Sequence, residues 1–170
     1  PDLLGLLAPV KTPMQAHCAQ IKEEDPDAFC VFIGPCVSKK NEADEADSVD
    51  AALTYDEITD WMAEKGALPV ACADPEPGRR ARFYPTAGGI IHSMNATPGY
   101  KRVAIDGIEN CRAALEELKT GAMQGVFVEM SACEGSCVGG PIIREHRERR
   151  LSGALKVYAG ADGGDFGAAP

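Results

Sequence analysis

Residues 28–33 read AFCVFI, and Gly34, Pro35 and Cys36 follow this run directly. An unbroken apolar run of this length is typical of a strand that is buried on both faces of a parallel sheet. Helical patterns separate this run from three further runs that read as strands, so strands and helices alternate. This alternation predicts an α/β fold, with a four-stranded, mostly parallel sheet flanked by helices. The three further runs are residues 49–53, 100–105 and 126–130.

Capping boxes mark where the predicted helices begin. In such a box a Thr or Asp is followed three residues later by Gln or Glu, and the two residues satisfy the first backbone N–H groups of the helix. Pro13 supports the first box, because proline suits the first helical position. The pairs with this spacing are Thr12 with Gln15, Thr54 with Glu57, and Asp106 with Glu109.

The composition is that of an ordinary globular protein, since 45% of the 170 residues are hydrophobic and 25% are charged. The net charge of −9, from 17 Lys and Arg against 26 Asp and Glu, argues against a nucleic-acid-binding protein. No apolar run approaches the ~20 residues of a membrane span. No signal peptide is visible, so we expect a cytoplasmic protein.

The two ends of the chain suggest a piece of a longer protein. The first residue is Pro1 rather than Met. The Gly- and Ala-rich residues 159–170 read as a linker to a further domain.

Cysteines stand in two loops that follow predicted strands. Cys36 follows the first strand, and Cys133 and Cys137 follow the last strand in the glycine-rich stretch 131–141. Functional loops leave the carboxyl ends of parallel strands, so we expect the three thiols to converge at one edge of the sheet. Glycines allow the backbone to approach a bulky inorganic group, and iron–sulfur clusters are held by Cys thiolates. The two loops together therefore favour an iron–sulfur site.

Other interpretations of these cysteines remain open. A zinc site usually needs a second cysteine pair or a histidine at ligand spacing, and none of the three histidines has that spacing. A disulfide between Cys133 and Cys137, or two small residues in a glycine loop, are the simplest alternatives. Cys18, Cys30 and Cys111 are expected to be buried as small apolar residues, whereas the role of Cys72 stays open.

The motifs around these cysteines resemble those of a known family. Pro35-Cys36-x-x-Lys39-Lys40-x-Glu42 resembles the second signature of the iron-only hydrogenase large subunit. Glu129-x-x-x-Cys133-x-x-x-Cys137-Val138-Gly139-Gly140 resembles the third signature. The stretches 11–13 and 84–90 look like two further segments that wall the active site of that family. The matches occur in family order over residues 11–141.

The resemblance implies that residues 1–158 are the second lobe of a hydrogenase catalytic domain, and it implies a role for each matching residue. In that family a [4Fe–4S] cluster shares one cysteine sulfur with a two-iron unit that carries CO, cyanide and a bridging dithiolate. Cys36 and Cys133 would then ligate the cubane, and Cys137 would be the bridging cysteine. Lys39 would hydrogen-bond a cyanide ligand, and Glu42 would match a carboxylate on the proton route. The residues that would line the pocket are Pro13, Gly34, Pro35, Tyr84, Pro85, Ile90 and Ser131.

The departures from the family pattern shape the expected function. The first signature, which supplies the fourth cubane cysteine, would belong to an upstream lobe of the same polypeptide, so we expect this stretch alone to lack the cofactor and activity. Gly34 and Ser131 stand where typical enzymes of the family have methionine. These changes resemble the sensory branch, in which a signalling domain follows. The expected function is therefore sensing of H₂ (H₂ ⇌ 2H⁺ + 2e⁻) for such a domain. The alternatives are an iron–sulfur assembly, scaffold or electron-transfer protein without the two-iron unit, and a plain catalytic hydrogenase.

Overall fold

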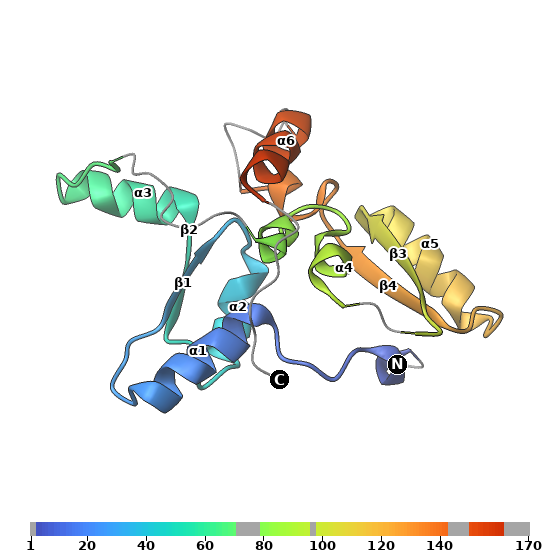
Figure 1. Cartoon of the computed structure of the whole chain (residues 1–170). Coiled ribbons are helices and arrows are strands. Elements are labelled where there is room, and N and C mark those ends of the chain that lie inside the picture. Colours follow the sequence, from blue (N-terminus) through green and yellow to red (C-terminus); the bar gives the residue numbers. More distant parts are fainter. Residues whose placement is uncertain (1–2, 71–78, 96–97, 143–149, 162–170) are drawn as a thin grey trace. The chain divides into compact units, whose positions relative to one another are not determined.

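The computed structural model describes residues 3–70, 79–95, 98–142 and 150–161. The chain divides into two compact units (Figure 1). The N-terminal unit comprises Leu6–Val70 with Pro141–Ile143. The C-terminal unit comprises Pro1–Gly5, Ala71–Gly140 and Arg144–Pro170.

The N-terminal unit is built on two short parallel strands, β1 and β2, that the helix α2 connects. Val31 lies opposite Ala51 and Gly34 opposite Thr54, so the two strands end at the same level. Because the two strands are close in the sequence, closing the loop between them costs little conformational entropy. The elements are α1 (Pro13–Glu24), β1 (Val31–Gly34), α2 (Ser38–Asp44), β2 (Ala51–Thr54) and α3 (Tyr55–Glu64). The short turn η1 (Leu4–Leu6) precedes them in the chain, and its residues are divided between the two units.

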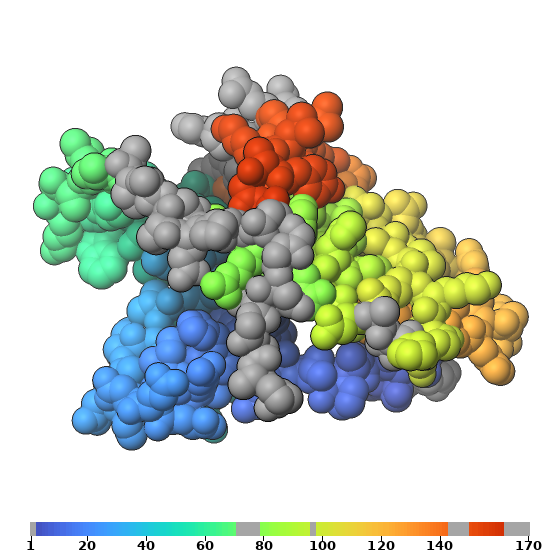
Figure 2. Space-filling model, in the orientation of Figure 1, coloured from blue at the N-terminus to red at the C-terminus, as the bar shows by residue number. Residues whose placement is uncertain are grey.

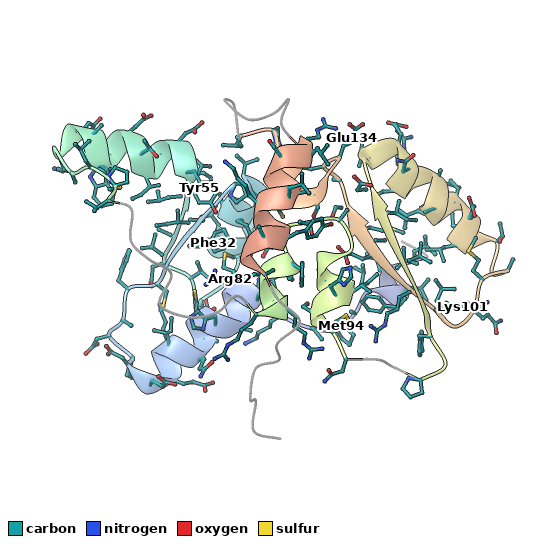
Figure 3. All side chains as sticks on the ribbon, turned by 45° about the horizontal axis from the view of Figure 1, so that its top comes forward. Phe32, Tyr55, Arg82, Met94, Lys101 and Glu134 are labelled. Atoms are coloured by element: carbon teal, nitrogen blue, oxygen red, sulfur yellow. The ribbon has the colours of Figure 1, made fainter. Side chains whose placement is uncertain are left out.

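The core of the N-terminal unit lies against one face of β1. Phe32, labelled in Figure 3, packs on this core, whereas Val31 and Ile33 on the opposite face are more than a third exposed. Neighbouring side chains of a strand point to opposite faces, and the core takes only one of them. The prediction that this run is buried on both faces is therefore wrong for the described residues. The core residues are Met14, Cys18, Cys30, Ala43 and Val49.

The buried cysteines are placed as the sequence predicts. Cys18 and Cys30 lie in this core, Cys111 is buried in the other unit, and Cys72 lies outside the described residues. Burial raises the pKa of the Cys18 thiol. Asp50 accepts a hydrogen bond from the backbone N–H of Cys30 at 2.6 Å and so fixes the entry to β1.

Two of the predicted capping boxes are confirmed. Thr12 caps α1, with the Gln15 side chain accepting from the Thr12 backbone N–H at 3.2 Å. Thr54 caps α3, and Glu57 accepts from the Thr54 backbone N–H at 2.8 Å. Both boxes form because each needs only residues three positions apart.

The α3 cap predicts a pH dependence of stability. Hydrogen bonds from Lys40 and then from the Thr54 backbone lower the pKa of Glu57 from 4.5 to about 2. Between these values the unfolded chain binds a proton that the folded chain does not, so this stabilisation is present above pH 4.5 and is lost as the pH falls towards about 2. We expect the urea midpoint of Glu57→Gln to fall less over this pH interval than that of the wild type. Equal falls in both proteins would contradict this assignment.

The C-terminal unit contains a second parallel pair, β3 and β4, with α5 as the connection. Lys101 lies opposite Val126 and Asp106 opposite Ser131, and α5 packs on both strands (Figure 1). Helix α6, red in Figure 2, contacts η2 and η3. The elements are η2 (Arg80–Phe83), α4 (Gly89–Ser93), β3 (Lys101–Asp106), α5 (Ile108–Lys119), β4 (Val126–Ser131), η3 (Ser136–Gly139) and α6 (Arg150–Gly160).

The α/β class with parallel strands is confirmed, but the strands pair differently from the single four-stranded sheet that the sequence predicts. Across the described residues they form two two-stranded sheets, β1–β2 and β3–β4. Each pair joins strands that are neighbours along the chain, which is the pairing with the shortest connection. The extent of the lobe, residues 1–158, and the linker at 159–170 stay predictions, because residues 162–170 lie outside the described part.

The third predicted capping box, at α5, is wrong. The N-cap of α5 is Gly107, and no side chain caps it. Asp106 instead ends β3, and its carboxylate accepts a hydrogen bond from the backbone N–H of Gly135 at 2.5 Å. The hydrogen bond with Gly135, 29 residues away along the chain, replaces the local capping contact with Glu109 that the sequence predicts.

Among the described helices, none has the length and apolar character that a membrane crossing requires.

Candidate metal centre

The first cysteine of the candidate site lies just beyond β1, in the N-terminal unit. Cys36 is half-buried, and its Sγ lies 3.0 Å from the Ser38 Oγ at the start of α2. Gly34 is buried at the end of the strand, and a Cβ there would lie 2.7 Å from the Phe32 ring. A side chain at position 34 would therefore require the ring to move.

Lys39 and Glu42 face each other on α2 and form an ion pair. The second oxygen of Glu42 accepts a hydrogen bond from the Thr12 hydroxyl at 2.9 Å. Thr12 is the N-cap of α1, and Pro13 is the first residue of that helix. The structure thus brings Lys39 and Glu42 together beside the start of α1, where Pro13 follows Thr12, and the carboxylate fixes where the ammonium group lies.

The second cysteine loop follows β4 and consists of two successive tight turns. The Ser136 N–H donates to the Cys133 carbonyl at 3.0 Å, and the Gly140 N–H donates to the Cys137 carbonyl at 3.1 Å. Both cysteines are half-buried, and neither forms a disulfide. The disulfide alternative for this pair is therefore absent from the described structure, and two thiols remain as sulfur donors.

Backbone crowding makes glycine necessary in this loop. A Cβ on Gly139 would lie 1.8 Å from the Glu134 carbonyl oxygen, so no side chain fits there. Ser136 has a φ of 58°, which is the left-handed region that favours glycine. Its hydroxyl lies 3.1 Å from the Ser131 Oγ, a contact that accompanies the strained backbone. Glycine at position 139 therefore allows the loop to fold closely on itself.

Contacts from three other elements hold the second loop in place. Asp106 at the end of β3 binds Gly135, as described above. Arg150 of α6 forms an ion pair of 2.5 Å with Glu134, which is labelled in Figure 3. The Val138 N–H donates to the Pro85 carbonyl at 3.1 Å. The loop is therefore ordered by the protein itself.

The stretch from Tyr84 to Ile90 forms the turn that Val138 contacts. Thr86 is only 2% exposed, and its hydroxyl donates to the Phe83 carbonyl at 2.7 Å. A Cβ on Gly89 would lie 1.8 Å from the same carbonyl oxygen, so this turn also admits only glycine at that position. Pro85 is thereby placed beside the Cys137 loop.

The predicted site residues fall into two groups, one in each unit. Within the described ranges, neither unit gathers three or more His, Cys, Asp or Glu side chains in the arrangement of a metal site. Convergence of the three thiols at one sheet edge stays a prediction. The N-terminal unit holds Pro13, Gly34, Pro35, Cys36, Lys39 and Glu42, and the C-terminal unit holds Tyr84, Pro85, Ile90, Ser131, Cys133 and Cys137.

The residues fit an iron–sulfur group in their chemistry. All three candidate ligands, Cys36, Cys133 and Cys137, offer sulfur, which is what such clusters require. The two glycines at positions 139 and 89 leave backbone, rather than side chains, beside the second loop.

Several contacts that hold the candidate site in place could not be predicted from the sequence. The Thr12–Glu42 bond and the Asp106–Gly135 bond join residues about 30 positions apart, and no local pattern indicates such partners. One signal was present: Glu129 interrupts an otherwise apolar strand. In the structure it is buried and accepts hydrogen bonds from the backbone N–H groups of Gly88 and Ile91.

Comparisons with known proteins give a consistent picture. The family model described as "Iron only hydrogenase large subunit, C-terminal domain" matches residues 1–101 and 94–141. No curated protein sequence matches the chain significantly.

Solved structures of [FeFe]-hydrogenases have the same fold. HydA(deltaEFG), whose structure concerns stepwise H-cluster assembly, is 18% identical with a TM-score of 0.62, over 91% of this chain and 61% of that one. A hydrogenase solved to study oxygen inactivation through its two-iron subcluster is 18% identical with a TM-score of 0.65, over 97% and 63%. A variant of HydA1 from Chlamydomonas reinhardtii is 17% identical with a TM-score of 0.63, over 96% and 64%. The chain thus spans about three fifths of the length of these structures.

Proposed function

The chain belongs to the family of iron-only hydrogenase large subunits, within their C-terminal domain, and on this basis we propose that it is one lobe of a domain that binds an H-cluster. Cys36 and Cys133 would ligate a [4Fe–4S] cubane, and Cys137 would join it to a two-iron unit. An upstream lobe of the same polypeptide would supply the fourth cubane ligand. When bound, the group supplies the cleavage H₂ ⇌ 2H⁺ + 2e⁻, as cofactors carry such chemistry while the protein positions them.

The ordered loop of Cys133 and Cys137 is the observation that supports this proposal most. It presents two thiols on turns closed by backbone hydrogen bonds, and Gly139 leaves no room for a side chain. A loop already held by the protein loses less conformational entropy when it binds a cluster.

Lys39 is the second support for the proposal. An ammonium group has three N–H donors, and one of them is engaged by Glu42. The remaining donors are free to hydrogen-bond an anionic ligand such as cyanide. Glu42 bridges the ammonium group and the Thr12 hydroxyl, which suits a carboxylate on a proton route.

The small residues at positions 34 and 131 favour a sensing role over fast turnover. Gly34 leaves no side chain, and the Ser131 hydroxyl is engaged with Ser136. The soft, polarisable thioethers of methionine are therefore missing from both places. In this proposal the domain binds H₂ and passes the redox state to a downstream signalling domain in the cytoplasm.

An infrared spectrum of the full-length protein after anaerobic maturation, with and without H₂, tests the function. CO and cyanide bands that shift under H₂ are the expected result. Bands that do not respond to H₂ would contradict sensing. Iron and sulfide without any such bands would overturn the two-iron site and favour the assembly, scaffold or electron-transfer alternative.

Replacing Lys39 by alanine is expected to remove the two-iron unit while leaving the cubane. The intensity of the CO and cyanide bands should fall by about tenfold or more, as for loss of an outer partner of a metal ligand. Iron and sulfide of the cubane should persist. Lys40→Ala is the matched control, because Lys40 lies next to Lys39 but pairs with Glu57 at 2.8 Å. Equal band loss in both variants would overturn the role of Lys39.

A further inference from the structure

Glu129 is a charged residue buried within β4, where it is only 4% exposed. Its strand neighbours Val128 and Met130 are apolar, and its backbone pairs with Ala104 of β3. Burying a carboxylate is costly unless hydrogen bonds compensate it. The strand pairing itself does not use the side chain, so the reason for this charge lies in what the carboxylate binds.

Both carboxylate oxygens accept hydrogen bonds from the beginning of α4. Oε1 accepts from the Gly88 N–H at 3.0 Å, and Oε2 accepts from the Ile91 N–H at 3.0 Å. Gly88 is the N-cap of α4 and has no side chain to satisfy these donors. Glu129 therefore acts as the missing cap from 41 residues away.

The segment held in this way is the turn that walls the candidate site. Val138 donates to the Pro85 carbonyl at 3.1 Å, so the turn is attached to the stretch 129–138 at two points. Glu129 makes the attachment before the cysteines, and Val138 makes it after them. Cys133 and Cys137 stand between the two attachments.

We propose that Glu129 is a positioning residue that sets where the wall formed by Tyr84–Ile90 stands relative to the loop of Cys133 and Cys137. This inference rests on the proposed function and deepens it. The carboxylate does not touch the cluster in this assignment. It acts through the backbone of Gly88 and Ile91, and thereby sets the polar surroundings of the two-iron unit.

The test compares Glu129→Gln with Glu57→Gln in the full-length protein. Glutamine keeps the size of the side chain but turns one of its two acceptors into an N–H₂ donor, which faces a backbone N–H. Glu57 is the matched control, because it also accepts from a helix-start N–H but lies in the N-terminal unit. Glu129→Asp serves as a second variant should the glutamine variant not fold, because aspartate keeps the charge but is too short to reach both donors.

Two readouts separate positioning from simple stabilisation. In the protein without cofactor, hydrogen exchange of peptides covering residues 84–93 should accelerate about tenfold in Glu129→Gln, since a buried donor is left unpaired, and should be unchanged in Glu57→Gln. In the matured protein, the CO and cyanide bands should shift in Glu129→Gln at unchanged cubane content, and should stay in place in Glu57→Gln.

Each outcome decides a different point. Faster exchange with bands at the wild-type positions would overturn positioning and leave Glu129 as a structural cap. Unchanged exchange would overturn the role of the carboxylate at α4. If the wild type itself shows no CO or cyanide bands, the proposed function fails and the positioning of a two-iron unit fails with it, while the exchange result still decides whether Glu129 holds the turn.

Discussion

Gly139→Ala is expected to abolish binding of the cluster. The Cβ of alanine would lie 1.8 Å from the Glu134 carbonyl oxygen, well inside van der Waals contact. The obstacle is backbone rather than the flexible end of a side chain, so the loop of Cys133 and Cys137 must change its path. Overpacking that forces the backbone to shift typically costs about 1–3 kcal/mol, and occasionally more. Iron and acid-labile sulfide per chain, measured after anaerobic reconstitution of the full-length protein, should fall to near zero.

Gly160→Ala is the matched control for this substitution. A Cβ on Gly160 meets nothing within 4 Å, and the residue closes α6, where alanine is a better helix former. Iron and sulfide content should therefore match the wild type. Full cluster content in Gly139→Ala would show that the loop can take another path, and would remove the main support for the proposed site.

Cys133→Ala is expected to be the second severe change, because it removes a sulfur donor that no neighbouring side chain can replace. Iron–sulfur clusters need thiolate ligands, and loss of one cubane ligand from this loop leaves Cys137 as its sole thiol. We expect iron and sulfide content to fall more than about 100-fold, because loss of an outer partner of a ligand already costs about 10- to 100-fold. The charge-transfer absorption of the cluster should disappear in parallel.

Cys18→Ala separates ligand loss from general damage to the fold. Cys18 is a buried cysteine of the N-terminal core, so its truncation removes packing but no candidate ligand. The variant should be less stable and yet bind a full complement of iron. If Cys18→Ala loses as much iron as Cys133→Ala, the assignment of Cys133 as a ligand is wrong.

The elements that the sequence predicts best are those specified by local patterns. Thr12 with Gln15 and Thr54 with Glu57 start their helices as expected, because a capping box involves one helical turn. The four strands lie within a few residues of the predicted ranges, since apolar runs bounded by turns are also local signals. The cysteine loops follow β1 and β4 for the same reason.

The sequence could not predict contacts between distant residues. Asp106 has the spacing of a helix cap with Glu109, yet its carboxylate binds Gly135 across the sheet end. The pairing of the strands likewise depends on contacts between residues that are far apart in the sequence. The described strands form two pairs where the sequence predicts one sheet. The partners of Glu129 lie about 40 residues away along the chain. Its place in an apolar strand indicated only that its carboxylate needs hydrogen-bond donors.

Burial makes some cysteines of this chain less available to bind iron than others. The thiolate is the form of cysteine that binds metal, and burial raises the pKa of the Cys18 thiol, which disfavours that form. Cys36, Cys133 and Cys137 are half-buried and remain accessible to solvent. If the chain binds a cluster as proposed, ferrous iron and sulfide would therefore meet a chain in which some cysteines are buried and others are partly exposed. On the proposed function, the fold itself would thus limit which thiols are available for cluster assembly.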